Sequence, residues 1–139
     1  MPAREGAAIM TTSSGATEGT GAARAAPGVH RQGRVICFAD LVESVRLMQR
    51  HEALAIDRWL RFAAWAREVL VPVHGGRTVR TAGDGLLMEF DTAPGALAAA
   101  FALHDEVCRY NDGFGADDAM WLRIGLNVAD VVVDFSCAS

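Results

Sequence analysis

The sequence predicts one α+β domain with the ferredoxin-like element order β-α-α-β-β-α-β. Two patterns indicate it: short apolar runs rich in β-branched residues alternate with segments of helical period, and an Asp-Gly pair separates two of the short runs. The length of 139 residues suits one domain and is too short for two of ordinary size. A hydrophobic fraction of 51% with 22% charged residues is typical of a globular protein.

Residues 1–33 are rich in Ala, Gly, Ser and Thr and show no sustained apolar period. This composition favours a disordered tail followed by a folded domain at 34–139. A secretory signal is disfavoured, because no apolar run of roughly 7–15 residues follows Arg4.

The first half of the domain should contain one strand and two helical segments. Residues 34–40 (RVICFAD) form a short apolar run that predicts a buried strand. Residues 41–50 predict a short helix and residues 51–71 a longer one, ended by Pro72 and Gly75–Gly76. Apolar side chains at three- and four-residue steps should form the buried face of the longer helix: Ile56, Trp59, Leu60, Ala63, Ala66 and Leu70. Arg58 and the other charged residues should lie on the opposite face.

The second half predicts a hairpin, a helix and a strand. Residues 78–82 and 86–90 read as strands joined by Gly83-Asp84-Gly85. Thr92 is a suitable N-cap for a helix that runs to about Tyr110. Its expected buried residues are Leu97, Ala100, Phe101, Leu103 and Val107. A strand at 121–127 follows, and residues 131–133 are expected to start another.

This topology brings two acids to one edge of the sheet. A right-handed crossover makes the first two strands parallel, and the third strand fits between them and runs antiparallel to the first. Asp40 at the end of the first strand then lies near Asp84 in the hairpin. Two carboxylates at one edge can hold a pair of Mg²⁺ ions, which prefer oxygen ligands and leave positions open for phosphates. Taken alone, an Asp at a strand end is more often a cap and an Asp-Gly pair is more often a turn. The spacing therefore leaves open whether the two residues bind metal or have only these structural roles.

The chain turns from strand into helix directly after Asp40. Free backbone N–H groups around Val42, Glu43 and Ser44 would form a seat for phosphate. Gly83 and Gly85 would let the backbone approach a ligand closely.

Charge and composition exclude several other classes of protein. A formal net charge of −4 argues against general nucleic-acid binding, which needs a basic face. No apolar window approaches the roughly 18 residues of a membrane span. The three cysteines, Cys37, Cys108 and Cys137, are widely spaced and form no zinc or disulfide pattern, so reduced thiols in the cytoplasm are expected.

Three segments together resemble successive blocks of the class III nucleotidyl cyclase catalytic domain. They are RVICFADLVESVRLM, HGGRTVRTAGDGLLMEF and WLRIGLNVADVVVD, and they cover about Arg34 to Asp134. The resemblance implies a palm-type form of the ferredoxin-like fold and an adenylate cyclase, which converts ATP to 3′,5′-cyclic AMP and pyrophosphate. A diguanylate cyclase is disfavoured, because the hairpin reads AGDGL and not the GG[DE]EF pattern.

The resemblance also implies roles for single residues. Asp40 and Asp84 match two metal-binding aspartates, which would hold two Mg²⁺ or Mn²⁺ ions together with the backbone carbonyl of Leu41. The segment from Leu41 to Ser44 matches the turn that cradles the phosphates. Arg123 matches an arginine that contacts the nucleotide phosphates. Arg80 stands where adenylate cyclases of the family usually carry an adenine-reading lysine, so it favours ATP over GTP.

One expected part has no counterpart in these residues. The family's active site is built across a dimer, and one chain supplies an Asn and an Arg, four residues apart, that position the ribose and stabilise the transition state. No candidate pair follows Asp134, where the sequence reads FSCAS. We therefore expect a truncated domain that is weak or inactive alone, as a homodimer or in a heterodimer with another cyclase domain. A catalytically silent nucleotide-binding or dimerisation module is the alternative.

Overall fold

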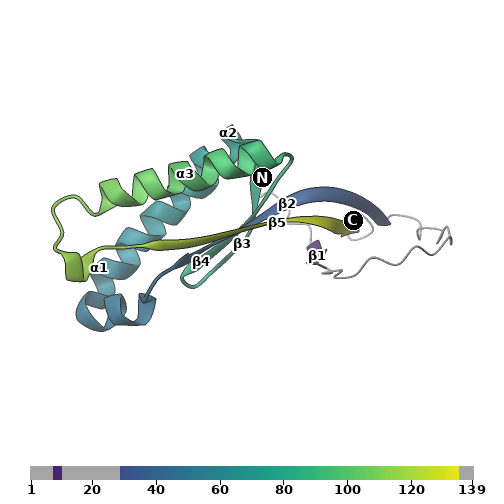
Figure 1. The fold of residues 1–139 in the computed structure, drawn as a ribbon. Helices are drawn as coiled ribbons and strands as arrows, with labels where there is room; N and C mark the ends of the chain where they lie inside the picture. The colour runs from purple at the N-terminus through teal and green to yellow at the C-terminus, as the bar shows by residue number, and fades with distance from the viewer. Residues whose placement is uncertain (1–7, 11–28, 135–139) are drawn as a thin grey trace.

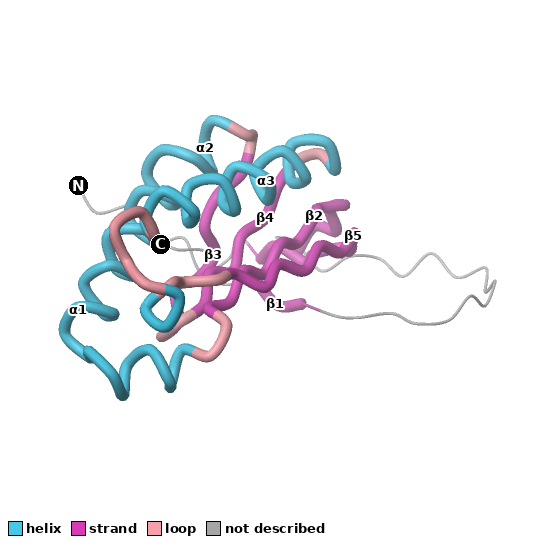
Figure 2. Tube along the Cα trace, turned by 60° about the vertical axis from the view of Figure 1, so that its left-hand side comes forward, coloured by secondary structure: helices cyan, strands magenta, loops and turns pink. Residues whose placement is uncertain are grey.

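The computed structural model describes residues 8–10 and 29–134, which form one sheet with helices packed on one of its faces (Figure 1). The strands are β1 (Ala8–Met10), β2 (Val29–Leu41), β3 (Gly76–Ala82), β4 (Gly85–Phe90) and β5 (Leu122–Asp134). The helices are α1 (Ser44–Trp65), a π-helical turn η1 (Ala66–Leu70), α2 (Val71–Val73), α3 (Ala93–Tyr110) and a 3₁₀ turn η2 (Ala116–Asp118). Figure 2 shows the two layers, with the helices in cyan on one side of the magenta strands.

The strand order β1-β5-β2-β4-β3 confirms the predicted topology. Every neighbouring pair is antiparallel, so β2 and β3 run parallel to each other with β4 between them. The helical connection from β2 to β3 is thus the predicted crossover. β5 lies on the other side of β2 and completes the ferredoxin-like arrangement.

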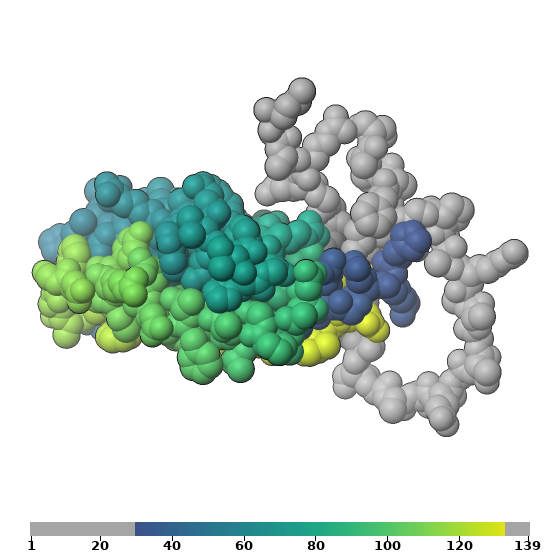
Figure 3. Space-filling model, turned by 90° about the horizontal axis from the view of Figure 1, so that it is seen from above, coloured from purple at the N-terminus to yellow at the C-terminus, as the bar shows by residue number. Residues whose placement is uncertain are grey.

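Two strands differ from their expected limits. β2 begins at Val29 rather than near Arg34, and β5 is continuous to Asp134 where two strands were expected. The cause is mutual pairing: both strands have 13 residues and are in register from end to end, so each supplies the hydrogen bonds of the other's extension. In the space-filling view their blue and yellow ends project beyond the helices (Figure 3). β1 also lies within the segment expected to be disordered; residues 1–7, 11–28 and 135–139 lie outside the described residues.

The two predicted helical segments form one helix with a kink. His51, where the second segment was expected to start, has the non-helical angles φ −147° and ψ 73°. The helical path then continues through η1 into α2, so Pro72 lies inside its last turn and does not end it. Gly75, at φ +72°, is the residue that turns the chain toward β3.

The core lies between the helices and one face of the sheet. Along β2 the side chains alternate: Cys37 and Ala39 are buried beneath the helices, whereas Phe38 is 48% exposed on the opposite, open face. Phe62 of α1 is at the centre, with no exposed surface. Its ring contacts three aromatic neighbours, Trp59, Trp65 and Tyr110, at centroid distances of 5.8, 6.0 and 5.6 Å.

The buried face of α1 is rotated from the predicted one. Leu60 and Ile56 are exposed, and Arg58, expected on the polar face, is buried. Its terminal nitrogens donate to the carbonyls of Asp118 and Tyr110, at 2.6 and 2.7 Å, which satisfies both of them, whereas its Nε is buried without a partner among the described residues. Burial lowers the pKa of Arg58, and the nearby Asp118 carboxylate partly offsets this effect.

Two large side chains of α3 are also exposed against expectation. Leu97 is 49% and Phe101 64% exposed, while the helix buries Ala96 and Ala99 completely. Small residues at the contact let α3 approach the sheet closely, which turns the larger apolar residues outward. They form an apolar surface on the helical side of the molecule.

Gly76 should tolerate no side chain. A Cβ at this position would overlap the ring of Phe90 and lie 2.9 Å from the carbonyl oxygen of Glu89. We expect Gly76→Ala to lower the free energy of unfolding by about 1–3 kcal/mol, because the β3–β4 pair must separate. Gly125→Ala is the matched control, since nothing lies within 4 Å of its Cβ. Urea denaturation of both variants measures the difference; equal stabilities would contradict the close packing.

The buried thiol of Cys37 should be inert in the folded protein. Burial raises its pKa to about 11, whereas Cys108 is an exposed free thiol. At pH 8 we expect an alkylating reagent to label Cys108 quickly and Cys37 only after unfolding, as located by peptide mass spectrometry. Because the unfolded thiol ionises first as the pH rises, stability should fall between about pH 9 and 11. Fast labelling of native Cys37 would show that the core opens readily.

No described helix is long and apolar enough to cross a membrane.

Candidate active site

Asp40 and Asp84 come to the same edge of the sheet. Asp40 pairs with Gly85 at the end of the β2–β4 ladder, directly beside the β3–β4 turn. The amide of Leu41 donates a hydrogen bond to the carbonyl of Asp84, with a donor–acceptor distance of 3.0 Å. The predicted topology therefore places these two distant residues next to each other.

Helix α1 holds the hairpin that carries Asp84. Gly83 adopts φ +51°, which favours glycine, and its carbonyl accepts a 2.8 Å hydrogen bond from the indole Nε1 of Trp59. The hydroxyl of Ser44 donates to Oδ2 of Asp84 at 2.5 Å. Sequence reasoning missed both contacts, since it assigned Ser44 a role through its amide and Trp59 a packing role. The contact of Trp59 could have been anticipated, because a buried indole needs a hydrogen-bond partner for its N–H.

Asp40 lies on the open face of the sheet, opposite Arg123. The two residues are paired in register across β2 and β5, and Nη2 of Arg123 lies 2.8 Å from Oδ2 of Asp40. The arginine side chain is 76% exposed, so little packing fixes it there. The residue predicted to bind phosphate thus contacts a predicted metal ligand.

The two carboxylates offer the oxygen ligands that a hard divalent cation prefers. Oδ1 of Asp40 and Oδ1 of Asp84 have no hydrogen-bond partner among the described residues. No group of three or more His, Cys, Asp or Glu residues suited to a metal occurs in the described part of the chain. Two carboxylate oxygens from the protein leave positions for water and phosphate, which is the usual mode of Mg²⁺ binding.

The turn after Asp40 offers fewer free amides than expected. The amide of Val42 is not free, because it donates to the carbonyl of Trp121 at 2.8 Å. Glu43 has left-handed angles, φ 52° and ψ 38°, and its carboxylate pairs with Arg46 at 2.9 Å. The phosphate seat predicted at Val42, Glu43 and Ser44 is therefore reduced to the last two amides.

A β-bulge places Arg80 on the open face. The register shifts between Thr78, which pairs with Met88, and Arg80, which pairs with Leu87. Because of this extra residue, Arg80 shares the face of Asp40 and Arg123 instead of pointing toward the helices. It is exposed and has no hydrogen bond or ion pair with the described residues. Arg80 is thus available to a ligand on the face where the aspartate lies.

A largely apolar cavity of about 420 Å³ adjoins the hairpin. It lies between the kinked part of α1 and the turn, with Ser44 and Asp84 on its wall. Its apolar lining is Met48, Ile56, Trp59 and Leu60.

Comparison with known proteins identifies the family. No protein-family profile matches the chain. The "Putative adenylate cyclase 3" of Rhizobium meliloti (strain 1021) is 36% identical over 112 residues, which cover 78% of this chain and 18% of that protein. The crystal structure of an adenylate/guanylate cyclase/hydrolase from Silicibacter pomeroyi is 31% identical, with a TM-score of 0.62 over 75% of this chain and 60% of that one. The chain carries a class III nucleotidyl cyclase catalytic domain.

More distant cyclases share the same fold. The adenylyl cyclase CyaB from P. aeruginosa is 14% identical, with a TM-score of 0.66 over 75% of this chain and 59% of that one. This cyclase chain thus spans about a fifth of the curated relative and about 60% of the two solved structures. The fold and family of the catalytic domain, predicted from the sequence, are confirmed.

Proposed function

We propose that this chain supplies the metal-binding half of an adenylate cyclase site, which converts ATP to 3′,5′-cyclic AMP and pyrophosphate. The observation that carries the proposal is the meeting of Asp40 and Asp84 at one edge of the sheet, directly beside an open face that presents Arg80 and Arg123. In this proposal the two aspartates bind metal, Arg123 binds the phosphates and Arg80 contacts the base.

Asp40 and Asp84 would hold two Mg²⁺ or Mn²⁺ ions, with the Leu41 carbonyl as a further ligand. Such ions lower the pKa of a bound hydroxyl and neutralise phosphate charge. Ser44 and Trp59 donate hydrogen bonds to the hairpin, and these would hold the Asp84 carboxylate in position. In the reaction, the ribose 3′-oxygen bonds to the α-phosphorus, its proton passes to solvent, and the bond to the pyrophosphate oxygen breaks.

Arg123 and Arg80 would orient the nucleotide. We propose that Arg123 leaves Asp40 when a triphosphate binds, because a polyanion offers more acceptors than one carboxylate and the side chain is exposed. Arg80 donates to ring nitrogens of adenine, whereas guanine presents N–H donors at the corresponding edge. This difference favours ATP over GTP.

A second cyclase chain would complete the site. We propose that the chain associates as a homodimer or with another cyclase domain, and that only a partner carrying an Asn and an Arg four residues apart completes the site. The exposed apolar side chains Leu97 and Phe101 on α3, and Leu60 on α1, support an association surface.

The decisive experiment separates binding from catalysis. A polypeptide of these 139 residues with Mn²⁺ and ATP should form little cyclic AMP, because positioned arginines contribute about 10³–10⁵ in rate to phosphoryl transfer. Mixing it with a relative whose metal aspartates are mutated should restore activity, with one complete site per heterodimer. Cyclic AMP only in the mixture supports the proposal. Nucleotide binding without activity in any mixture would instead favour the silent binding module, and full activity of this polypeptide alone would contradict the division of roles.

A further inference from the structure

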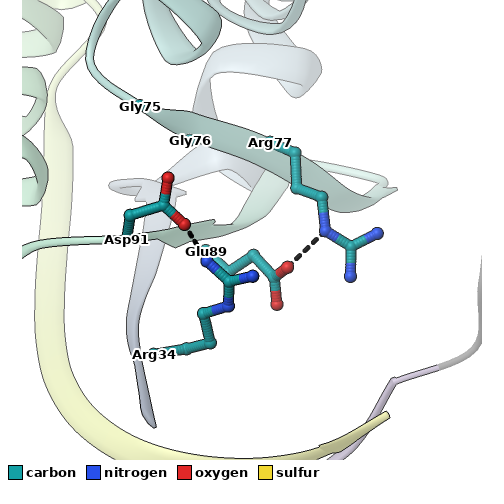
Figure 4. Close-up of a pocket in the computed structure, with 6 residues that line it drawn as sticks. All are labelled: Arg34, Gly75, Gly76, Arg77, Glu89 and Asp91. Atoms are coloured by element: carbon teal, nitrogen blue, oxygen red, sulfur yellow. Dashed lines mark hydrogen bonds and ion pairs between the residues drawn. The ribbon is translucent and has the colours of Figure 1, made fainter. Parts of the chain in front are cut away.

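A second polar cavity lies at the far end of β4 from the hairpin. It has a volume of about 270 Å³ and is lined by Arg34, Gly75, Gly76, Arg77, Glu89 and Asp91. Figure 4 shows its charged side chains arriving from three neighbouring strands, with Arg77 ion-paired to Glu89 and Arg34 to Asp91. β4 spans six residues between the two ends, or roughly 20 Å. This cavity is therefore separate from the Asp40–Asp84 edge.

Two buried polar atoms of the residues that line this cavity have no partner. The Glu89 side chain is 4% exposed, and its Oε1 accepts from Arg77, but its Oε2 is unpaired. Nε of Arg34 is likewise buried and unpaired, although its two terminal nitrogens bond to Asp91 and Gln32. No ion pair joins Arg34 to Glu89 in the described structure. An unpaired buried carboxylate oxygen costs about 1–3 kcal/mol or more, so a donor at this position would be favourable.

The unpaired atoms define the ligand they would accept. Glu89 Oε2 needs a donor and Arg34 Nε needs an acceptor, and one hydroxyl group supplies both. Arg77 uses only its Nε, so its terminal nitrogens, on a half-exposed side chain, remain available to an anion at the rim. The four formal charges of the cluster cancel, which favours a singly charged anion over a polyanion.

We propose that this cavity binds a ligand in which a hydroxyl group lies next to a singly charged phosphodiester, as in a 3′,5′-cyclic nucleotide. The ribose 2′-hydroxyl donates to Glu89 and accepts from Arg34, and the phosphate contacts Arg77. The volume takes the sugar and phosphate and leaves the base outside. That the ligand is also the product of this protein rests on the proposed function; the binding site itself does not.

The probe is cyclic AMP, measured by calorimetry without added metal. The wild type should bind it, and 2′-deoxy cyclic AMP should bind at least about tenfold more weakly, because the Glu89 contact is lost. The dianionic 5′-AMP should also bind more weakly. Equal binding of the deoxy compound, or no binding of cyclic AMP, would overturn the proposal.

Two variants separate this site from the metal edge. Glu89→Gln should abolish cyclic AMP binding and keep the binding of Mn²⁺ with an ATP analogue, whereas Asp84→Asn should do the opposite. If Glu89→Gln does not fold, Arg77→Gln, on a half-exposed side chain, should weaken cyclic AMP binding at least about tenfold by itself. Cyclic AMP binding that Asp84→Asn removes would place the ligand at the metal edge and overturn the proposal. A wild type that binds cyclic AMP but does not bind Mn²⁺ with the ATP analogue would contradict the proposed function only.

Discussion

Asp84→Ala should abolish the stabilisation that Mn²⁺ and a non-hydrolysable ATP analogue give to the folded protein. A ligand at 100 times its Kd adds about 2.7 kcal/mol, which is roughly 10 °C in the unfolding midpoint of a domain of this size. The variant removes one of the two carboxylates at the sheet edge, so the ions that we propose to lie between protein and phosphates would lose a ligand. Thermal unfolding with and without the metal and nucleotide measures the effect.

The controls for this experiment lie in the same chain. Asp40→Ala should lose the shift as well, because it removes the other carboxylate. Asp112→Ala changes an exposed aspartate in the loop after α3 and should keep the full shift. Because Asp84 also accepts the hydroxyl of Ser44, the midpoint without ligand must be compared first. A shift that survives in both site variants would place the nucleotide elsewhere.

Phe62→Ala should remove a large part of the stability of the domain. The ring is fully buried among three other aromatic rings, and deleting such a side chain costs about 3–5 kcal/mol, against a total of about 5–15 kcal/mol. Leu60→Ala, two residues earlier on the same helix and 56% exposed, should cost less than about 1 kcal/mol. Guanidinium denaturation gives both values. Similar costs at the two positions would mean that the buried face of α1 is the one expected from the sequence.

Local periodicity was sufficient to predict the order of elements. The apolar run over 34–40 and the helical spacing over 51–71 are properties of short segments, and even the break at His51 coincides with a change of pattern. The buried faces were less predictable. Leu60 and Phe101 are exposed and Arg58 is buried, because the rotation of a helix on the sheet depends on which neighbours accept its side chains. Those neighbours are distant in sequence.

The sequence by itself determined that Asp40 and Asp84 meet, because a crossover followed by a hairpin has one favoured handedness. Only the tertiary structure decided what surrounds them. One extra residue in β3 turns Arg80 onto the open face, and the register of β2 with β5 sets Arg123 against Asp40. A shift of one residue would move either arginine to the opposite face, and register is fixed by pairing along whole strands, which no local pattern records.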